Sequence, residues 1–133
     1  MLEIEANTLN EMVNASVVPF GCEYEKLLAD NLTAIVRLKK DAGLKVEEAA
    51  IKDQKEHLAE VVTKIYYVRH NASEMMKLLE KAKKLHHEER AELYFEELKP
   101  LMEHIRRHVD ALECVVSDEH WDLPKYREML FIK

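Results

Sequence analysis

A long hydrophobic stripe between residues 51 and 86 constrains this fold more than any other feature. Its members alternate three and four positions apart without a break: Ile51, Gln54, Leu58, Val61, Ile65, Val68, Ala72, Met75, Leu79, Ala82 and His86. A period of 3.5 residues is typical of a helix that packs lengthwise against other helices. At 1.5 Å per residue, a helix over residues 46–85 would span about 60 Å. Because a rod of this length cannot cover its own apolar edge, the flanking segments must do so.

The flanking segments predict two further helices, over residues 2–39 and 88–116. The stripe of the first is Val17, Phe20, Tyr24, Leu27, Asn31, Ala34 and Leu38, and that of the second is Phe95, Leu98, Met102, Ile105, Val109, Leu112 and Val116. The connections are short, so we expect consecutive helices to run antiparallel. The sequence therefore predicts an all-α fold, with residues 1–133 forming one domain: a long, coiled-coil-like, antiparallel three-helix bundle.

Three residues inside these helices have predicted structural roles. Pro19 lacks the backbone donor of a regular helix, so we expect a kink at residues 18–21. Pro100 predicts a similar local disruption in the third helix. Asn31 is a polar residue within an apolar stripe, a device that fixes helix register at some cost in stability.

Residues 117–133 predict a short tail that packs on the bundle. Bulky apolar side chains are concentrated there, and Pro124 suits the first position of a short helix over residues 125–131. An unpacked tail of this composition would be prone to aggregation, so it must dock on the bundle or on a neighbouring domain. The residues expected to anchor the tail are Trp121, Pro124, Tyr126 and Phe131.

Charge and hydropathy exclude several classes of partner. The formal charge of −6 argues against binding to a nucleic-acid backbone, which requires a basic surface. No apolar run approaches the roughly 18 residues of a membrane span, and the first residues lack the basic flank of a signal peptide. Cys22 and Cys114 belong to no paired-cysteine motif, so we expect reduced, mostly buried thiols in a cytoplasmic protein.

The ionisable residues offer little catalytic chemistry. None of the seven histidines follows a glutamate by three positions, as the ligands of a di-metal bundle would, and His-Glu-x-x-His is also absent from the sequence. His104 and His108 are weak metal candidates because a spacing of four places both on one helix face. Without further ligands, exposed histidines beside an apolar stripe are the simpler interpretation. We therefore expect a chain with no catalytic residue, cofactor or metal of its own.

Two stretches, near the beginning and the end of the chain, resemble a known family. The first comprises residues 3–9, EIEANTL, and residues 17–19, VVP; the second comprises residues 97–102, ELKPLM, and residues 121–131, WDLPKYREMLF. In this order and spacing they resemble the C-terminal region of type III glutamine synthetases. Asp122 departs from the family pattern, which has a proline there.

The resemblance implies that the chain is the C-terminal helical domain of a longer enzyme. Such a parent would ligate ammonia to glutamate with ATP and Mg²⁺ or Mn²⁺, using residues of an upstream catalytic domain. The helical domain would brace that domain and assist assembly of a homo-oligomer.

Two other functions remain open on the sequence. One is a free-standing helical adaptor module without a parent enzyme. The weaker is a metal-binding bundle that uses the His104 and His108 pair.

Overall fold

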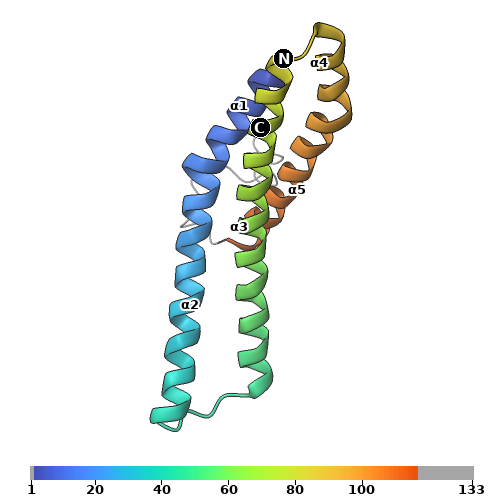
Figure 1. Cartoon of the computed structure of the whole chain (residues 1–133). Helices are drawn as coiled ribbons and strands as arrows, with labels where there is room; N and C mark the ends of the chain where they lie inside the picture. The colour runs from blue at the N-terminus through green and yellow to red at the C-terminus, as the bar shows by residue number, and fades with distance from the viewer. Residues whose placement is uncertain (1, 117–133) are drawn as a thin grey trace, which may run out of the picture.

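The computed structural model describes residues 2–116, which form helices joined by short connections (Figure 1). The elements are α1 (Leu2–Met12), a π-helical turn (Val13–Val17), α2 (Val18–Asp41), α3 (Glu48–Lys83), α4 (His87–Leu93), a second π-helical turn (Tyr94–Leu98) and α5 (Lys99–Val115). Because the π turns join α1 to α2 and α4 to α5 without a break, the described part of the chain forms three rods. These pack together without any strand, which confirms the predicted all-α class. The predicted tail lies outside the described residues.

Each π turn immediately precedes a helix that has a proline at its second position. The N–H of Val18 donates to the carbonyl of Val13, and that of Lys99 to the carbonyl of Tyr94, each five residues back. In a regular helix, a proline ring clashes with the carbonyl four residues earlier. The wider π turn accommodates Pro19 and Pro100 while the rod continues. The irregularity in the first rod therefore precedes residues 18–21, where the sequence predicted a kink.

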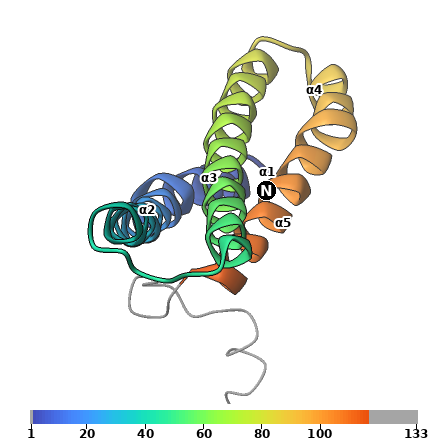
Figure 2. The same ribbon diagram turned by 90° about the horizontal axis from the view of Figure 1, so that it is seen from below.

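The hydrophobic core lies in the half of the molecule where all three rods meet. Seen along the long axis, α3 lies between α2 and α5 (Figure 2). The stripe of α3 is buried from Val61 to Ala82, and that of α5 from Met102 to Val109 and at Leu112. The first rod contributes Ala6, Leu9, Val13 and Val17. Gly21 is buried against α3, where a Cβ atom would lie 3.1 Å from two side-chain carbons of Ile65. The missing side chain thus permits close approach of α2 to α3.

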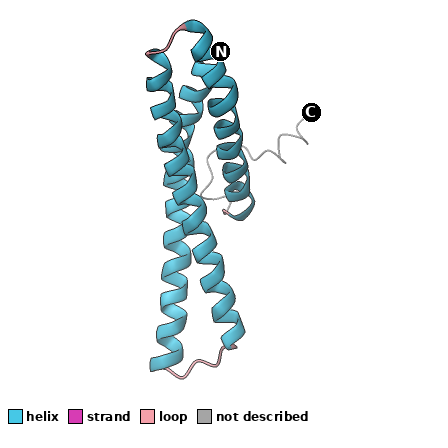
Figure 3. Cartoon of the chain, turned by 45° about the vertical axis from the view of Figure 1, so that its right-hand side comes forward, coloured by secondary structure: helices cyan, strands magenta, loops and turns pink. Residues whose placement is uncertain are grey.

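The other half is a projecting pair of helices (Figure 3). The third rod starts beside the C-terminal end of α3, crosses it at an angle and ends about halfway along it (Figures 1 and 3). Beyond that point the predicted stripe of the first helix is not buried: Leu27 is 41% exposed and Leu38 is 49% exposed. The prediction failed there because the third rod is too short and too tilted to reach these residues.

Arg90 closes the turn that links α3 to α4. Its Nε donates to the carbonyl of Ala82 at 3.1 Å, and its Nη2 lies 3.4 Å from the carbonyls of Lys83 and Leu85. The last carbonyls of a helix lack intrahelical partners and carry partial negative charge. The guanidinium of Arg90, from the next helix, supplies both hydrogen-bond donors and a positive charge to these carbonyls. The chain therefore reverses here without glycine or proline.

Gly43 ends α2 by adopting a left-handed backbone conformation, with φ at 67°. The N–H of the following Leu44 then donates to the carbonyl of Leu38 at 3.2 Å. We expect Gly43→Ala to lower the free energy of unfolding by about 1 kcal/mol, because a Cβ atom disfavours this conformation. No atom lies within 4 Å of the added Cβ, so the cost is confined to the backbone. Urea unfolding measures the effect; Gly43→Asn should lose less, and an unchanged Gly43→Ala variant would contradict the assignment.

Candidate functional site

The predicted histidine pair does come together on α5. The Nε2 atoms of His104 and His108 lie 3.2 Å apart, and the ring of Tyr67 from α3 stacks on His108 with 5.4 Å between centroids. Partial burial, and then the nearby charges of His104 and Lys64, lower the pKa of His108 below its ordinary value. Two such nitrogens could chelate a metal ion from one side. Among residues 2–116, however, no group of three or more histidine, cysteine or acidic side chains is placed to hold a metal ion.

The two cysteines are exposed, which contradicts the prediction that they are buried. Cys22 follows the buried Gly21, and Cys114 follows the buried Glu113. Successive side chains on an α-helix point about 100° apart. Each thiol therefore faces away from the core although the residue before it is buried. The phase of the helix outweighs the general tendency of cysteine to be buried.

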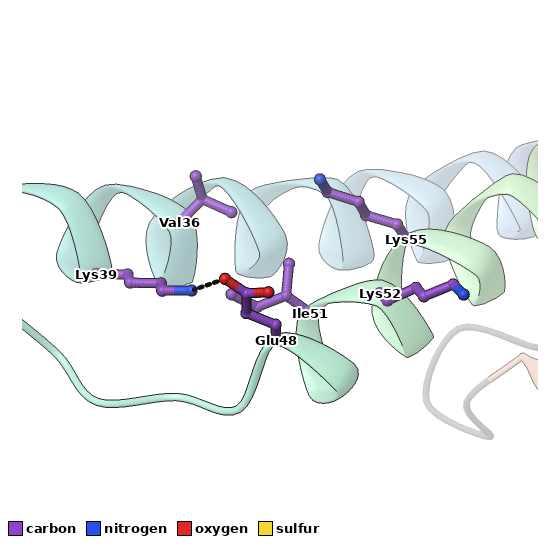
Figure 4. Close-up of a pocket in the computed structure, with 6 residues that line it drawn as sticks. All are labelled: Val36, Lys39, Glu48, Ile51, Lys52 and Lys55. Carbon is purple, nitrogen blue, oxygen red and sulfur yellow. Dashed lines mark ion pairs between the residues drawn. The ribbon is translucent and has the colours of Figure 1, made fainter.

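The distal hairpin, defined as residues 24–61, is the first candidate interaction surface. A contact of 3.2 Å between Tyr24 Oη and His57 Nε2 joins its two helices near the limit of the core. One side of the hairpin has a shallow hollow, lined by Val36, Lys39, Glu48, Ile51, Lys52 and Lys55 (Figure 4). Lys39 pairs there with Glu48 at 3.8 Å. We call this side the basic face, since its lysines outnumber its single acid.

The opposite side of the hairpin carries a groove, which we call the open groove. It is lined by Leu28, Asn31, Ala34, Ile35, Asp53, Gln54 and His57. His57 and Lys64 are seven residues apart and therefore share a face of α3. Lys64 is close enough to His108 of α5 to affect its pKa. The open groove thus continues the surface on which α5 packs, and Asn31 lies exposed within it rather than in a closed seam.

A second candidate surface lies at the other end of the molecule and is centred on Phe95. This ring is 71% exposed, although the sequence placed it in the buried stripe of the third helix. The π turn at Tyr94–Leu98 changes the helix phase, so Leu98 faces the core while Phe95 faces outward. A hollow there is lined by Leu2, Glu5, Ala91, Tyr94, Phe95 and Lys99. We call these residues the apical patch.

The remaining predicted structural residues fall in two groups. Pro19 and Pro100 occupy equivalent second positions of α2 and α5, as described above. Trp121, Pro124, Tyr126 and Phe131 lie outside the described residues. Within residues 2–116, none of the helices combines the length and the apolar character that a bilayer span requires.

Comparison with known proteins relates the chain to one group of enzymes. No family model matches the sequence. A glutamine synthetase from Bacteroides fragilis is 32% identical over 133 residues, and a type-3 glutamine synthetase from Dictyostelium discoideum is 26% identical over 133 residues. Each alignment covers 99% of this chain but only 18% of the relative, so the chain spans under a fifth of their length. The chain is therefore homologous, over essentially its whole length, to a domain-sized part of glutamine synthetases, the type-3 enzyme included.

Proposed function

We propose that this chain is the non-catalytic C-terminal helical domain of a type III glutamine synthetase. The observation that carries the proposal is homology along the entire chain to a small part of two glutamine synthetases. The parent enzyme would ligate ammonia to glutamate at the expense of ATP, with Mg²⁺ or Mn²⁺, in the cytoplasm. The residues for that chemistry would lie in an upstream catalytic domain of the same chain.

The role proposed for the helical domain is to brace the catalytic domain and to support assembly of a homo-oligomer. Clustered exposed apolar side chains are typical of interaction surfaces. The apical patch presents Phe95 in this way, with the half-buried Leu2 beside it, and we assign it to the contact with the catalytic domain. The distal hairpin projects beyond the core (Figure 3). The lysines of its basic face suit a contact with an acidic surface of another subunit.

Phe95→Glu in a parent enzyme tests the bracing role. A carboxylate in place of the apolar ring must be desolvated at the contact and should weaken it, so we expect a lower melting temperature and a smaller assembled fraction by light scattering. The KM values for ATP and glutamate of the assembled enzyme should not change. Tyr66→Glu is the matched control, because Tyr66 is a 57% exposed aromatic residue outside the apical patch.

Two results would contradict the proposal. Glutamine formation by the isolated chain from glutamate, ammonia and ATP would show that it is catalytic. Equal assembly and melting temperature in the Phe95→Glu variant and the unmodified enzyme would show that the apical patch braces nothing.

A further inference from the structure

The distal hairpin has an apolar stripe that no described segment covers. Along α2 the stripe continues from Tyr24 through Leu27, Asn31 and Ala34 to Leu38, with the regular spacing that it has in the core. Two packed helices bury only part of each apolar edge. In the upper half of the molecule the third rod, α4 to α5, covers the remaining part (Figure 3). The continuation of the stripe indicates that a third segment packs on the open groove as well.

The described chain ends beside this groove. Val116 follows α5, is 2% exposed and belongs to the same core cluster as Val61, the last buried residue of α3 toward the hairpin tip. The view along the axis shows the end of α5 beside α3, on the side of the molecule away from the α3–α4 turn (Figure 2). Because the open groove continues the surface on which α5 packs, the described chain ends near its entrance.

The segment that follows has suitable length and composition. Residues 117–133 could extend over roughly 56 Å, or about 25 Å as a helix, whereas α3 from Glu48 to Val61 covers only about 20 Å. The segment includes the large apolar residues Trp121, Leu123, Tyr126, Met129, Leu130 and Phe131. We propose that residues 117–133 lie along the open groove and cover the exposed stripe of the distal hairpin.

Covalent attachment favours this occupant over a second copy of the chain. A segment tethered at the entrance of its groove has an effective concentration in the millimolar range when the linker is short. The seventeen residues also supply apolar side chains that can pack on the stripe. Docking in this way would extend the third rod toward the tip of the hairpin.

Trp121 is the only tryptophan of the chain, so its fluorescence reports directly on docking of this segment. The test compares Leu27→Glu with Val36→Glu in the full 133-residue chain. Both side chains are 41% exposed, and both lie on α2. They are nine residues apart, which is two and a half turns, so they lie on opposite sides of the helix. Leu27 precedes Asn31 and Ala34, which line the open groove, by four and seven positions and so lies on their side of α2. Val36 lines the basic face.

The proposal predicts protected Trp121 fluorescence in the unmodified chain and in Val36→Glu. In Leu27→Glu, the emission maximum should move toward that of the urea-unfolded chain, and acrylamide should quench Trp121 more strongly. Far-UV circular dichroism should show unchanged helix content. If Leu27→Glu loses helix, Leu38→Glu replaces it, since that residue is eleven positions along the same stripe and also exposed.

Three results would overturn the proposal. Trp121 could be as accessible in the unmodified chain as in the unfolded one. Both variants could release it equally, which would place the segment on no particular face. Protection that disappears on dilution, together with a halved mass by light scattering, would identify a second copy as the occupant.

Discussion

Replacing Leu112 by alanine is expected to lower the free energy of unfolding by about 2–5 kcal/mol, the range for deleting most of a buried leucine side chain. Leu112 has no exposed surface and packs in the core formed by all three rods. Truncation there removes apolar burial and leaves a cavity that closely packed helices cannot fill completely. Urea unfolding followed by circular dichroism measures the change.

The control for this variant is Leu44→Ala in the loop between α2 and α3. Leu44 is 42% exposed, so the same substitution removes much less buried surface and should cost about 1 kcal/mol or less. Equal losses in the two variants would mean that the core does not lie where the three rods meet.

Replacing Arg90 by alanine is expected to cost about 1–3 kcal/mol, which is typical of lost hydrogen bonds from a charged donor. The guanidinium is the donor to three carbonyls around the end of α3. Without it these carbonyls lose a charged partner, and the turn from Lys84 to His86 loses its link to α4. Thermal unfolding and amide exchange at the end of α3 would both register the loss.

Two further variants separate this role from loss of charge. Arg90→Lys keeps the charge but lacks the fork of donors, so it should retain only part of the stability. Arg106→Ala removes an exposed arginine from α5 and should change stability by less than about 0.5 kcal/mol. If Arg90→Ala and Arg106→Ala unfold at the same temperature, Arg90 does not cap α3.

The two exposed surfaces fit a domain that works as part of something larger. The chain covers 18% of each related glutamine synthetase, and both its apical patch and its basic face carry apolar or charged side chains that its own core does not use. Under the proposed function, these surfaces would be contact sites for the rest of a parent enzyme. The open groove is different, because the tail of the same chain can fill it.

Periodicity could predict the helices but not their overlap. The stripe from Val61 to Ala82 is buried as its spacing indicates, because every third or fourth side chain faces the neighbouring rods. The equally regular stripe at Leu27 and Leu38 is exposed, since spacing carries no information about where a partner helix stops. Length and tilt of the third rod decide that, and both depend on the packing of all three.

The candidate surfaces were less accessible to sequence reasoning than the core. The spacing of His104 and His108 correctly brought two imidazoles to one helix face. Phe95 was predicted to be buried, but a π turn adds a residue to the helical repeat and rotates the ring outward. The proline that follows is the only signal of this shift in the sequence of the third rod. Arg90 was missed because its partners are carbonyls, which carry no sequence signature.

The helical character of the chain, the apolar edges of α3 and α5 and the two stretches that resemble a glutamine synthetase could all be predicted from the sequence. Each of these depends on residues near one another along the chain. The packing of the three rods was needed to show that Phe95 and the cysteines face outward, that Arg90 caps α3, and that the hairpin projects beyond the core. These features depend on how far one rod overlaps another, and that overlap is a balance of packing over the whole molecule rather than a property of any segment.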